Sequence, residues 1–211
     1  MQVGDSVRHA LDNYGAREWD AAMMNACNAV DGTAKKRYPK LGTAARFKQL
    51  LREEIDTLGA MGMPGLNLRE TRWPVRVVSR LPDRRPDIAD VIYGVHRCAH
   101  GHGDELRSGF ELTEPDETSD GLPVSRIEVE QGKVRLPAST IIGLVAVAVF
   151  APENKGQPIS ADHWMSWRGN EFLVRDWWGR AADFVEIIEG AELQQVTMND
   201  WGEWWDDWEP T

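Results

Sequence analysis

The sequence predicts a mainly α-helical protein of the α+β class, a helical bundle with short antiparallel β-hairpins in its C-terminal half. Several segments of the 211-residue chain carry apolar residues at the helical spacing i, i+3, i+4 and i+7. Two segments between residues 127 and 174 instead place apolar residues on either side of a glycine-containing turn. Hydrophobic residues make up 42% of the chain and charged residues 27%, a composition that excludes an intrinsically disordered or fibrous protein.

Two amphipathic helices are expected in the first third of the chain. The first spans residues 18–38 and ends before Pro39, because proline cannot continue a helix. Its apolar face consists of Trp19, Ala22, Met23, Ala26, Cys27, Val30 and Ala34. The second runs from the N-cap candidate Thr43 to Gly59. Its apolar face consists of Phe47, Leu50, Leu51, Ile55 and Leu58.

Residues 59–86 are expected to form a loop, because glycine and proline recur throughout them. Within this loop lie six arginines, namely Arg69, Arg72, Arg76, Arg80, Arg84 and Arg85. Only Glu70 and Asp83 oppose them in the same stretch of sequence. The loop is therefore either an ordinary solvated connection or the rim of an anion-binding site.

A third helix is expected to begin at Pro86 and Asp87 and to end at Gly101 or Gly103. Its buried stripe would consist of Ile88, Val91, Ile92 and Val95. This helix matters most for function, because its end carries an unusual group of histidines.

The C-terminal half combines an exposed loop, two hairpins and two helices. Residues 108–123 are acidic and rich in turn residues, which is typical of a loop. Hairpins are expected over 127–136, turning at Gln131-Gly132, and over 163–174, turning at Gly169-Asn170. An apolar helix over 138–150 and a core helix over 176–189 follow the pattern of buried helices. The core helix would bury Trp177, Ala181, Phe184, Val185 and Ile188.

The chain ends in an acidic, tryptophan-rich segment, residues 197–211, after one expected domain over residues 1–196. The tail carries Trp201, Trp204, Trp205 and Trp208 at helical spacing, interleaved with acidic residues. On a helix this spacing gives one indole face. The rings either pack on the protein's own body or form a docking motif for a partner or a second subunit.

Nothing in the sequence predicts a membrane or secreted protein. The longest apolar run, residues 141–151, is too short to cross a bilayer. The N-terminus lacks the basic and apolar regions of a signal peptide. Two cysteines cannot form a disulfide framework in a chain of this size. We therefore expect a cytoplasmic protein with no membrane partner.

Three of the five histidines lie within seven residues: His96, His100 and His102. In a first interpretation, Arg97 and His102 form an R-x4-H pair for metal-free RNA cleavage, in which the arginine holds the phosphodiester and the histidine acts as general acid/base. In a second, the three histidines and Cys98 bind a metal ion, although no further ligand pair occurs elsewhere in the sequence. In a third, they are polar groups that close a helix.

The first interpretation gains from a resemblance. About residues 15–105 resemble the HEPN superfamily. The resemblance lies in two helices over 18–38 and 43–59, followed by a helix that ends in Arg97-Cys98-Ala99-His100-Gly101-His102-Gly103. The resemblance implies a metal-independent ribonuclease, a toxin or antiviral defence effector, that acts as a homodimer and needs no cofactor. By position, Arg97 and His102 would be the catalytic residues. Catalytic members often have a polar residue where this chain has Cys98, which leaves a non-catalytic member as the alternative.

Further residues are predicted to serve this site. His100 and Asp31 are possible helpers, although Asp31 could equally form an i,i+4 ion pair with Lys35. The predicted RNA contacts are Lys35, Lys36, Arg37, Arg84 and Arg85. The net charge of −10 does not exclude RNA, because residues 1–110 hold 17 basic and 14 acidic side chains while residues 111–211 hold 7 and 20.

Several enzyme classes lack support in the sequence. There is no P-loop, no G-x-G-x-x-G after a strand, no H-E-x-x-H and no G-x-S-x-G. Two functions of different class stay open: an RNA-cleaving homodimer, and a non-catalytic protein that binds an antitoxin or another protein through its Trp-rich tail. A histidine- and cysteine-based metal-binding protein is the third possibility.

Overall fold

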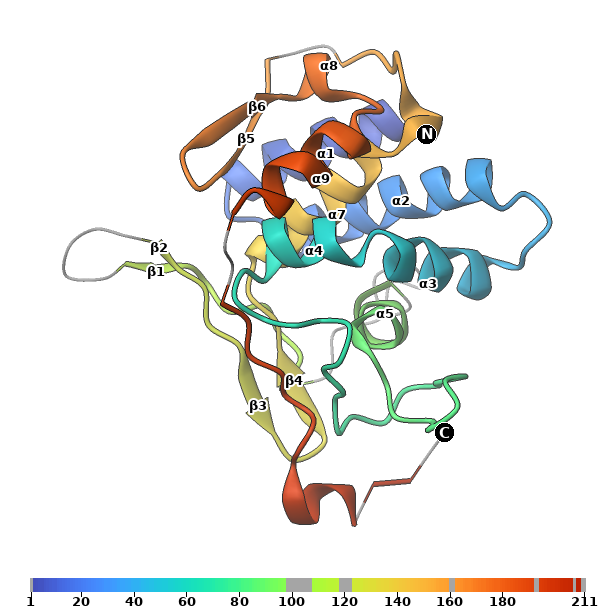
Figure 1. Ribbon diagram of the computed structural model, residues 1–211, viewed down its shortest axis with the longest axis vertical. Coiled ribbons are helices and arrows are strands. Elements are labelled where there is room, and N and C mark those ends of the chain that lie inside the picture. The colour runs from blue at the N-terminus through green and yellow to red at the C-terminus, as the bar shows by residue number, and fades with distance from the viewer. Residues whose placement is uncertain are drawn as a thin grey trace.

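A computed structural model describes residues 2–97, 108–117, 123–159, 162–191, 194–206 and 208–209. The fold is mainly α-helical with small antiparallel hairpins, as the sequence predicts. In Figure 1 the longer helices gather at one end of the molecule, and the β3–β4 hairpin and the C-terminal segment extend from the other.

Helices account for most of the regular structure in the described residues. The longer ones are α1 (Val3–Gly15), α2 (Trp19–Arg37), α3 (Thr43–Glu53), α4 (Ile55–Gly62), α7 (Ser139–Phe150) and α9 (Ala181–Glu189). Short helical segments are α5 (Ile88–Val91), the π-helix η1 (Ile92–Arg97), the 3-10 turn η2 (Pro152–Asn154), α8 (Val174–Trp177) and the 3-10 turn η3 (Gly202–Trp205). None of the helices in the described ranges is long and apolar enough to cross a membrane.

Three antiparallel strand pairs lie in the described residues of the C-terminal half. They pair β1 (Asp116–Glu117) with β2 (Pro123–Val124), β3 (Glu128–Glu130) with β4 (Lys133–Arg135), and β5 (Trp164–Trp167) with β6 (Asn170–Leu173). The β3–β4 turn at Gln131-Gly132 is confirmed. The expected loop over 108–123 contains β1 and runs into β2, so it is not wholly irregular.

The turn predicted at Gly169-Asn170 is wrong by one residue. Asn170 pairs with Trp167, so the two-residue turn is Arg168-Gly169. Both turn residues have positive φ, 49° and 82°, as the tight hairpin turn that matches strand twist requires. The glycine meets this requirement without strain, and the arginine before it adopts the left-handed conformation as well.

Two predicted helices are divided, and one helix was not predicted. The helix expected over 43–59 breaks at Glu54 and continues to Gly62. The helix expected over 176–189 begins at Val174 and breaks around Gly179, whose φ is +79°. A Cβ atom on Gly179 would lie 2.8 Å from Lys155 Cβ, so a close approach of the chain accompanies this break. Helix α1, which buries Val3, Val7 and Ala10, has no counterpart among the predictions.

Helix α7 forms the centre of the core. It is apolar all round, with ten of its 12 residues buried, and it packs against α1, α2 and α4. Its contact with α4 is close because two glycines face each other there. A Cβ atom on Gly143 would lie 2.9 Å from both the Gly62 Cα and the Leu58 carbonyl oxygen.

Replacing Gly143 by alanine is expected to lower the free energy of unfolding by about 1–3 kcal/mol, because the added methyl group meets backbone atoms that cannot rotate away. Urea unfolding followed by circular dichroism would measure this. Gly15 at the end of α1 is the matched control, since a Cβ atom there has no neighbour within 4 Å. Equal stability of Gly143→Ala and Gly15→Ala would contradict the close α4–α7 packing.

Candidate functional site

The segment that leads to Arg97 begins as predicted. Asp87 caps α5, and its side chain accepts a hydrogen bond of 2.9 Å from the backbone N–H of Asp90. After Val91 the backbone continues as the π-helix η1, which ends at Arg97. π-Helical turns are rare and often occur at functional sites.

Arg97 lies beside Asp31 on α2. The Arg97 Nη2 group is 3.4 Å from Asp31 Oδ2, and about a fifth of each side chain is exposed. Arg46 on α3 donates to Asp31 Oδ1 through Nε at 3.0 Å and Nη2 at 2.9 Å. The structure therefore brings the predicted helper Asp31 to the predicted catalytic arginine. The alternative pair of Asp31 with Lys35 is absent from the described ion pairs.

The histidine group is described only in part. His96 is buried, with 1% of its surface exposed. Cys98, His100 and His102 lie outside the described residues, so their predicted roles stay predictions. No group of three or more histidine, cysteine or acidic residues in the described ranges could hold a metal ion.

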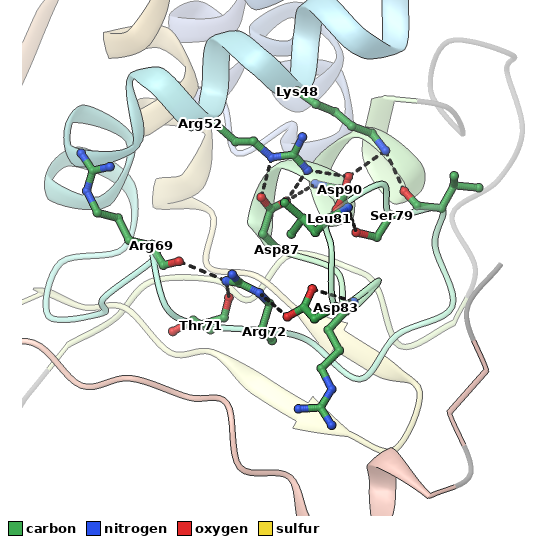
Figure 2. A network of polar contacts seen from close by, with 12 residues as sticks. Lys48, Arg52, Arg69, Thr71, Arg72, Ser79, Leu81, Asp83, Asp87 and Asp90 are labelled. Atoms are coloured by element: carbon green, nitrogen blue, oxygen red, sulfur yellow. Dashed lines mark hydrogen bonds and ion pairs between the residues drawn. The ribbon is translucent and has the colours of Figure 1, made fainter.

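A buried polar network holds α5 and η1 against α3 (Figure 2). Asp90 is fully buried, and its Oδ1 accepts from Lys48 Nζ at 2.8 Å and from Arg52 Nη2 at 2.9 Å. Arg52 also donates to Asp87 Oδ2 at 2.6 Å. Lys48 Nζ further donates to the Val78 carbonyl oxygen at 2.7 Å. The network thus joins α3, the Arg97-bearing helix and the arginine-rich loop.

These network residues and Arg46 were not predicted as part of the site. One signal was present in the sequence: Lys48 and Arg52 are four residues apart on a predicted helix, and Asp87 and Asp90 are three apart at the start of another. Those spacings do not predict which helices pack together. The charged groups were therefore recognisable as two helix faces but not as one network.

The basic cluster on α2, residues 35–37, mostly contacts other parts of the protein. Arg37 forms ion pairs with Glu53, Glu54 and Glu153 at 2.7–3.3 Å. Burial alone would lower the pKa of its guanidinium, but the hydrogen bonds to Glu153 and Glu54 raise that pKa above its ordinary value. Arg37 thus connects α2 with α3 and η2 and is not a free phosphate ligand.

The neighbours of Arg37 differ from one another. Both Lys35 and Lys36 are exposed, but Lys36 Nζ donates to Asn154 Oδ1 at 2.8 Å. Burial and a hydrogen bond to Glu53 raise the pKa of Tyr38 to about 12. Of the three predicted basic contacts on α2, Lys35 is the one whose amino group forms no ion pair or hydrogen bond in the described parts of the chain.

The arginine-rich loop contains two kinds of arginine. Arg69 is held by Asp56 and Arg72 by Asp83. In contrast, the side chains of Arg76, Arg80 and Arg84 are exposed and form no ion pair with any carboxylate in the described ranges. Of the two predicted RNA contacts in this loop, Arg84 belongs to the unpaired set.

The C-terminal tail folds back onto this loop. The indole N–H of Trp201 donates to the Arg72 carbonyl oxygen at 2.6 Å, and that of Trp208 to the Val75 carbonyl oxygen at 2.9 Å. The other predicted loop contact, Arg85, lies over the Trp205 ring at 4.4 Å. The rings thus pack on the protein's own body. The described part of the tail forms the 3-10 turn η3 and not a continuous helix with one indole face.

The family model Rv1289 matches residues 2–205. The chain belongs to the Rv1289 family. Its relatives include the uncharacterized proteins Rv1289 of Mycobacterium tuberculosis and Mb1320 of Mycobacterium bovis. Each is 46% identical over 211 residues, which cover 100% of this chain and 98% of the relative. No solved structure matches the chain.

Membership of the Rv1289 family relates this chain to others over its whole length. Both of these relatives are uncharacterized proteins. The chemistry of the Arg97 site is therefore the basis for a functional proposal.

Proposed function

We propose that this protein is a metal-independent endoribonuclease of the HEPN type that acts as a homodimer. In this proposal Arg97 binds the scissile phosphodiester and His102 acts as general acid/base. The observation that carries it is the position of Arg97: a partly exposed arginine at the end of a π-helix, held on one side by Asp31.

The charge of the site favours an anion. Arg46 and Arg97 share the one carboxylate of Asp31, so this group of three side chains has a net charge of +1. A guanidinium has five N–H donors, and the Asp31 contact of Arg97 uses only its Nη2 group. The Arg97 Nη1 group has no hydrogen-bond partner within the described ranges, so it can donate to a phosphate oxygen.

Asp31 then acts as a positioning residue. Because Arg46 donates twice to Asp31 Oδ1, the carboxylate is fixed, and Oδ2 is left to orient Arg97. Such an oriented guanidinium stabilises the negative charge that develops on the non-bridging phosphate oxygens when the 2′-hydroxyl attacks. His102 would remove the proton of that hydroxyl or protonate the leaving 5′-oxygen.

The test is cleavage of fluorescently labelled RNAs by the purified full-length chain. We expect cleavage that is unchanged by EDTA, products that end in a 2′,3′-cyclic phosphate, and no cleavage of DNA of the same sequence, because DNA lacks the attacking hydroxyl. Light scattering on the same sample should show a dimer.

Two outcomes would contradict the proposal. One is a folded, dimeric protein that leaves varied RNAs intact, which would favour the non-catalytic binding protein. The other is activity that EDTA removes together with bound zinc, which would favour the metal-binding alternative.

A further inference from the structure

We propose that residues 74–85 form a binding surface for single-stranded RNA, with Arg76, Arg80 and Arg84 as its phosphate contacts. This inference rests on the proposed function for the choice of RNA as the anion. It goes beyond that function because it places substrate binding on a segment outside the Arg97 site.

The first support is the alternation of side chains along the segment. Trp73, Val75, Val77 and Ser79 are buried, whereas Arg76, Val78 and Arg80 are exposed. The backbone N–H of Val75 donates to the Trp73 carbonyl oxygen at 2.8 Å and that of Val77 to the Val75 carbonyl oxygen at 3.1 Å, so successive γ-turns shape this segment. The arrangement therefore presents a row of side chains to solvent, two of them cationic.

The second support is that Arg76, Arg80 and Arg84 form no ion pair with a described carboxylate, even though the acidic tail lies beside the segment. Asp83, the acidic residue within the segment, is engaged by Arg72 at 3.4 Å. Asp87 and Asp90, which follow it, are engaged by Arg52 and Lys48. Positive charge on the three exposed arginines is thus left for an external anion.

The third support is the way the segment is fixed. Lys48 Nζ holds the Val78 carbonyl oxygen from one side, and the indole of Trp208 holds the Val75 carbonyl oxygen from the other. Arg84 has φ +56°, an uncommon conformation for a non-glycine residue, and its N–H donates to the Leu81 carbonyl oxygen at 2.9 Å. A segment whose backbone is held in this way loses less conformational freedom on binding than a mobile loop.

The fourth support is contact with the Arg97 helix. Val77 packs on Gly94 of η1, where a Cβ atom would lie only 2.9 Å from the Val77 Cβ. Gly94 is three residues before Arg97 in the same π-helix. An RNA strand bound along the segment would therefore lie beside the helix whose end carries the proposed catalytic arginine.

The test is binding of a fluorescent single strand of about 15 nucleotides, 2′-O-methylated to prevent cleavage, measured by anisotropy at several KCl concentrations. The variant is the triple change Arg76→Gln, Arg80→Gln, Arg84→Gln. We expect its affinity to fall at least about tenfold, and the slope of log affinity against log salt to fall by about 2, since each phosphate contact in a single strand contributes about 0.7.

The matched control is Arg17→Gln, Arg126→Gln, Arg175→Gln, which removes the same charge from side chains that are 55–77% exposed. We expect it to change the affinity less than about twofold. Thermal unfolding of each protein shows whether it is folded. A single Arg80→Gln variant is less prone to misfold than the triple variant, and when folded it should bind the strand measurably less tightly than the wild type.

The outcomes separate the two proposals. Three results would each overturn the proposed binding surface. The two triple variants could lose affinity equally, the Arg76/Arg80/Arg84 variant could keep the wild-type affinity, or the wild type could fail to bind the strand. A wild type that binds as expected but cleaves no RNA would leave the binding surface supported and contradict the nuclease.

Discussion

Replacing Arg97 by alanine is expected to reduce the rate of RNA cleavage at least about 100-fold, the effect of removing one donor that stabilises the charge of a transition state. Folding should be little affected, because Asp31 keeps its two hydrogen bonds from Arg46. The measurement is kcat/KM on a labelled RNA, with thermal unfolding of the same sample.

Two further variants make this result specific. Arg97→Lys keeps the charge but loses the planar pair of donors, so it should restore only a small part of the rate. His102→Ala should be as inactive as Arg97→Ala. The control is Arg17→Ala, whose side chain is 77% exposed and should retain full activity. If Arg97→Ala cleaves at the wild-type rate, Arg97 does not catalyse.

The second large effect concerns stability. Replacing Asp90 by alanine is expected to lower the free energy of unfolding by about 3–5 kcal/mol, because it removes the carboxylate partner of Lys48, whose side chain is only 11% exposed, and leaves Arg52 with Asp87 alone. Asp90 has no exposed surface, so water cannot take its place without a rearrangement of the core. Urea unfolding of both proteins at one pH and ionic strength would measure the difference.

The matched control is Asp56→Ala, which breaks the ion pair with Arg69. Both side chains of that pair are 58% exposed, so its loss should cost no more than about 1 kcal/mol. The double variant Lys48→Met, Asp90→Leu should recover part of the stability, since apolar side chains can replace a buried ion pair. Equal effects of Asp90→Ala and Asp56→Ala would contradict a structural role for this network.

The tail shows why a bulk charge is a poor guide to partners in this protein. Its acidic segment lies along the arginine-rich loop, with Trp201 and Trp208 bonded to the loop backbone. The net charge of −10 is therefore unevenly distributed: unpaired arginines and an acidic tail occupy neighbouring surfaces. Binding of an anion in this region depends on that local arrangement more than on the total.

Local elements could be predicted because their signals are local. The apolar repeat of α2, the cap at Asp87 and the turn at Gln131-Gly132 each lie within a few residues of sequence, and the structure confirms all three. The repeat Val3, Val7 and Ala10 of α1 was equally present in the sequence. Polar residues between these positions complete an amphipathic pattern, so this helix could have been predicted from the sequence as well.

Helix breaks followed from contacts between distant segments. The helical pattern over 176–189 continues through Gly179. This pattern does not predict that Lys155 packs against the glycine. The sharp change at Glu54 and the π-helical turn after Val91 are likewise invisible to a periodicity of 3.6 residues.

The sequence alone determined the fold class, most helices and hairpins, and the choice of Arg97 and Asp31 as candidates, because spacing and residue type are properties of the chain itself. Only the tertiary structure decided that Asp31 lies beside Arg97, which follows it by 66 residues. It also decided that Arg37 forms ion pairs with carboxylates and that the tail covers part of the arginine-rich loop. These pairings are set by which apolar faces pack together. Burial is not directional, so no local pattern specifies which distant faces will meet.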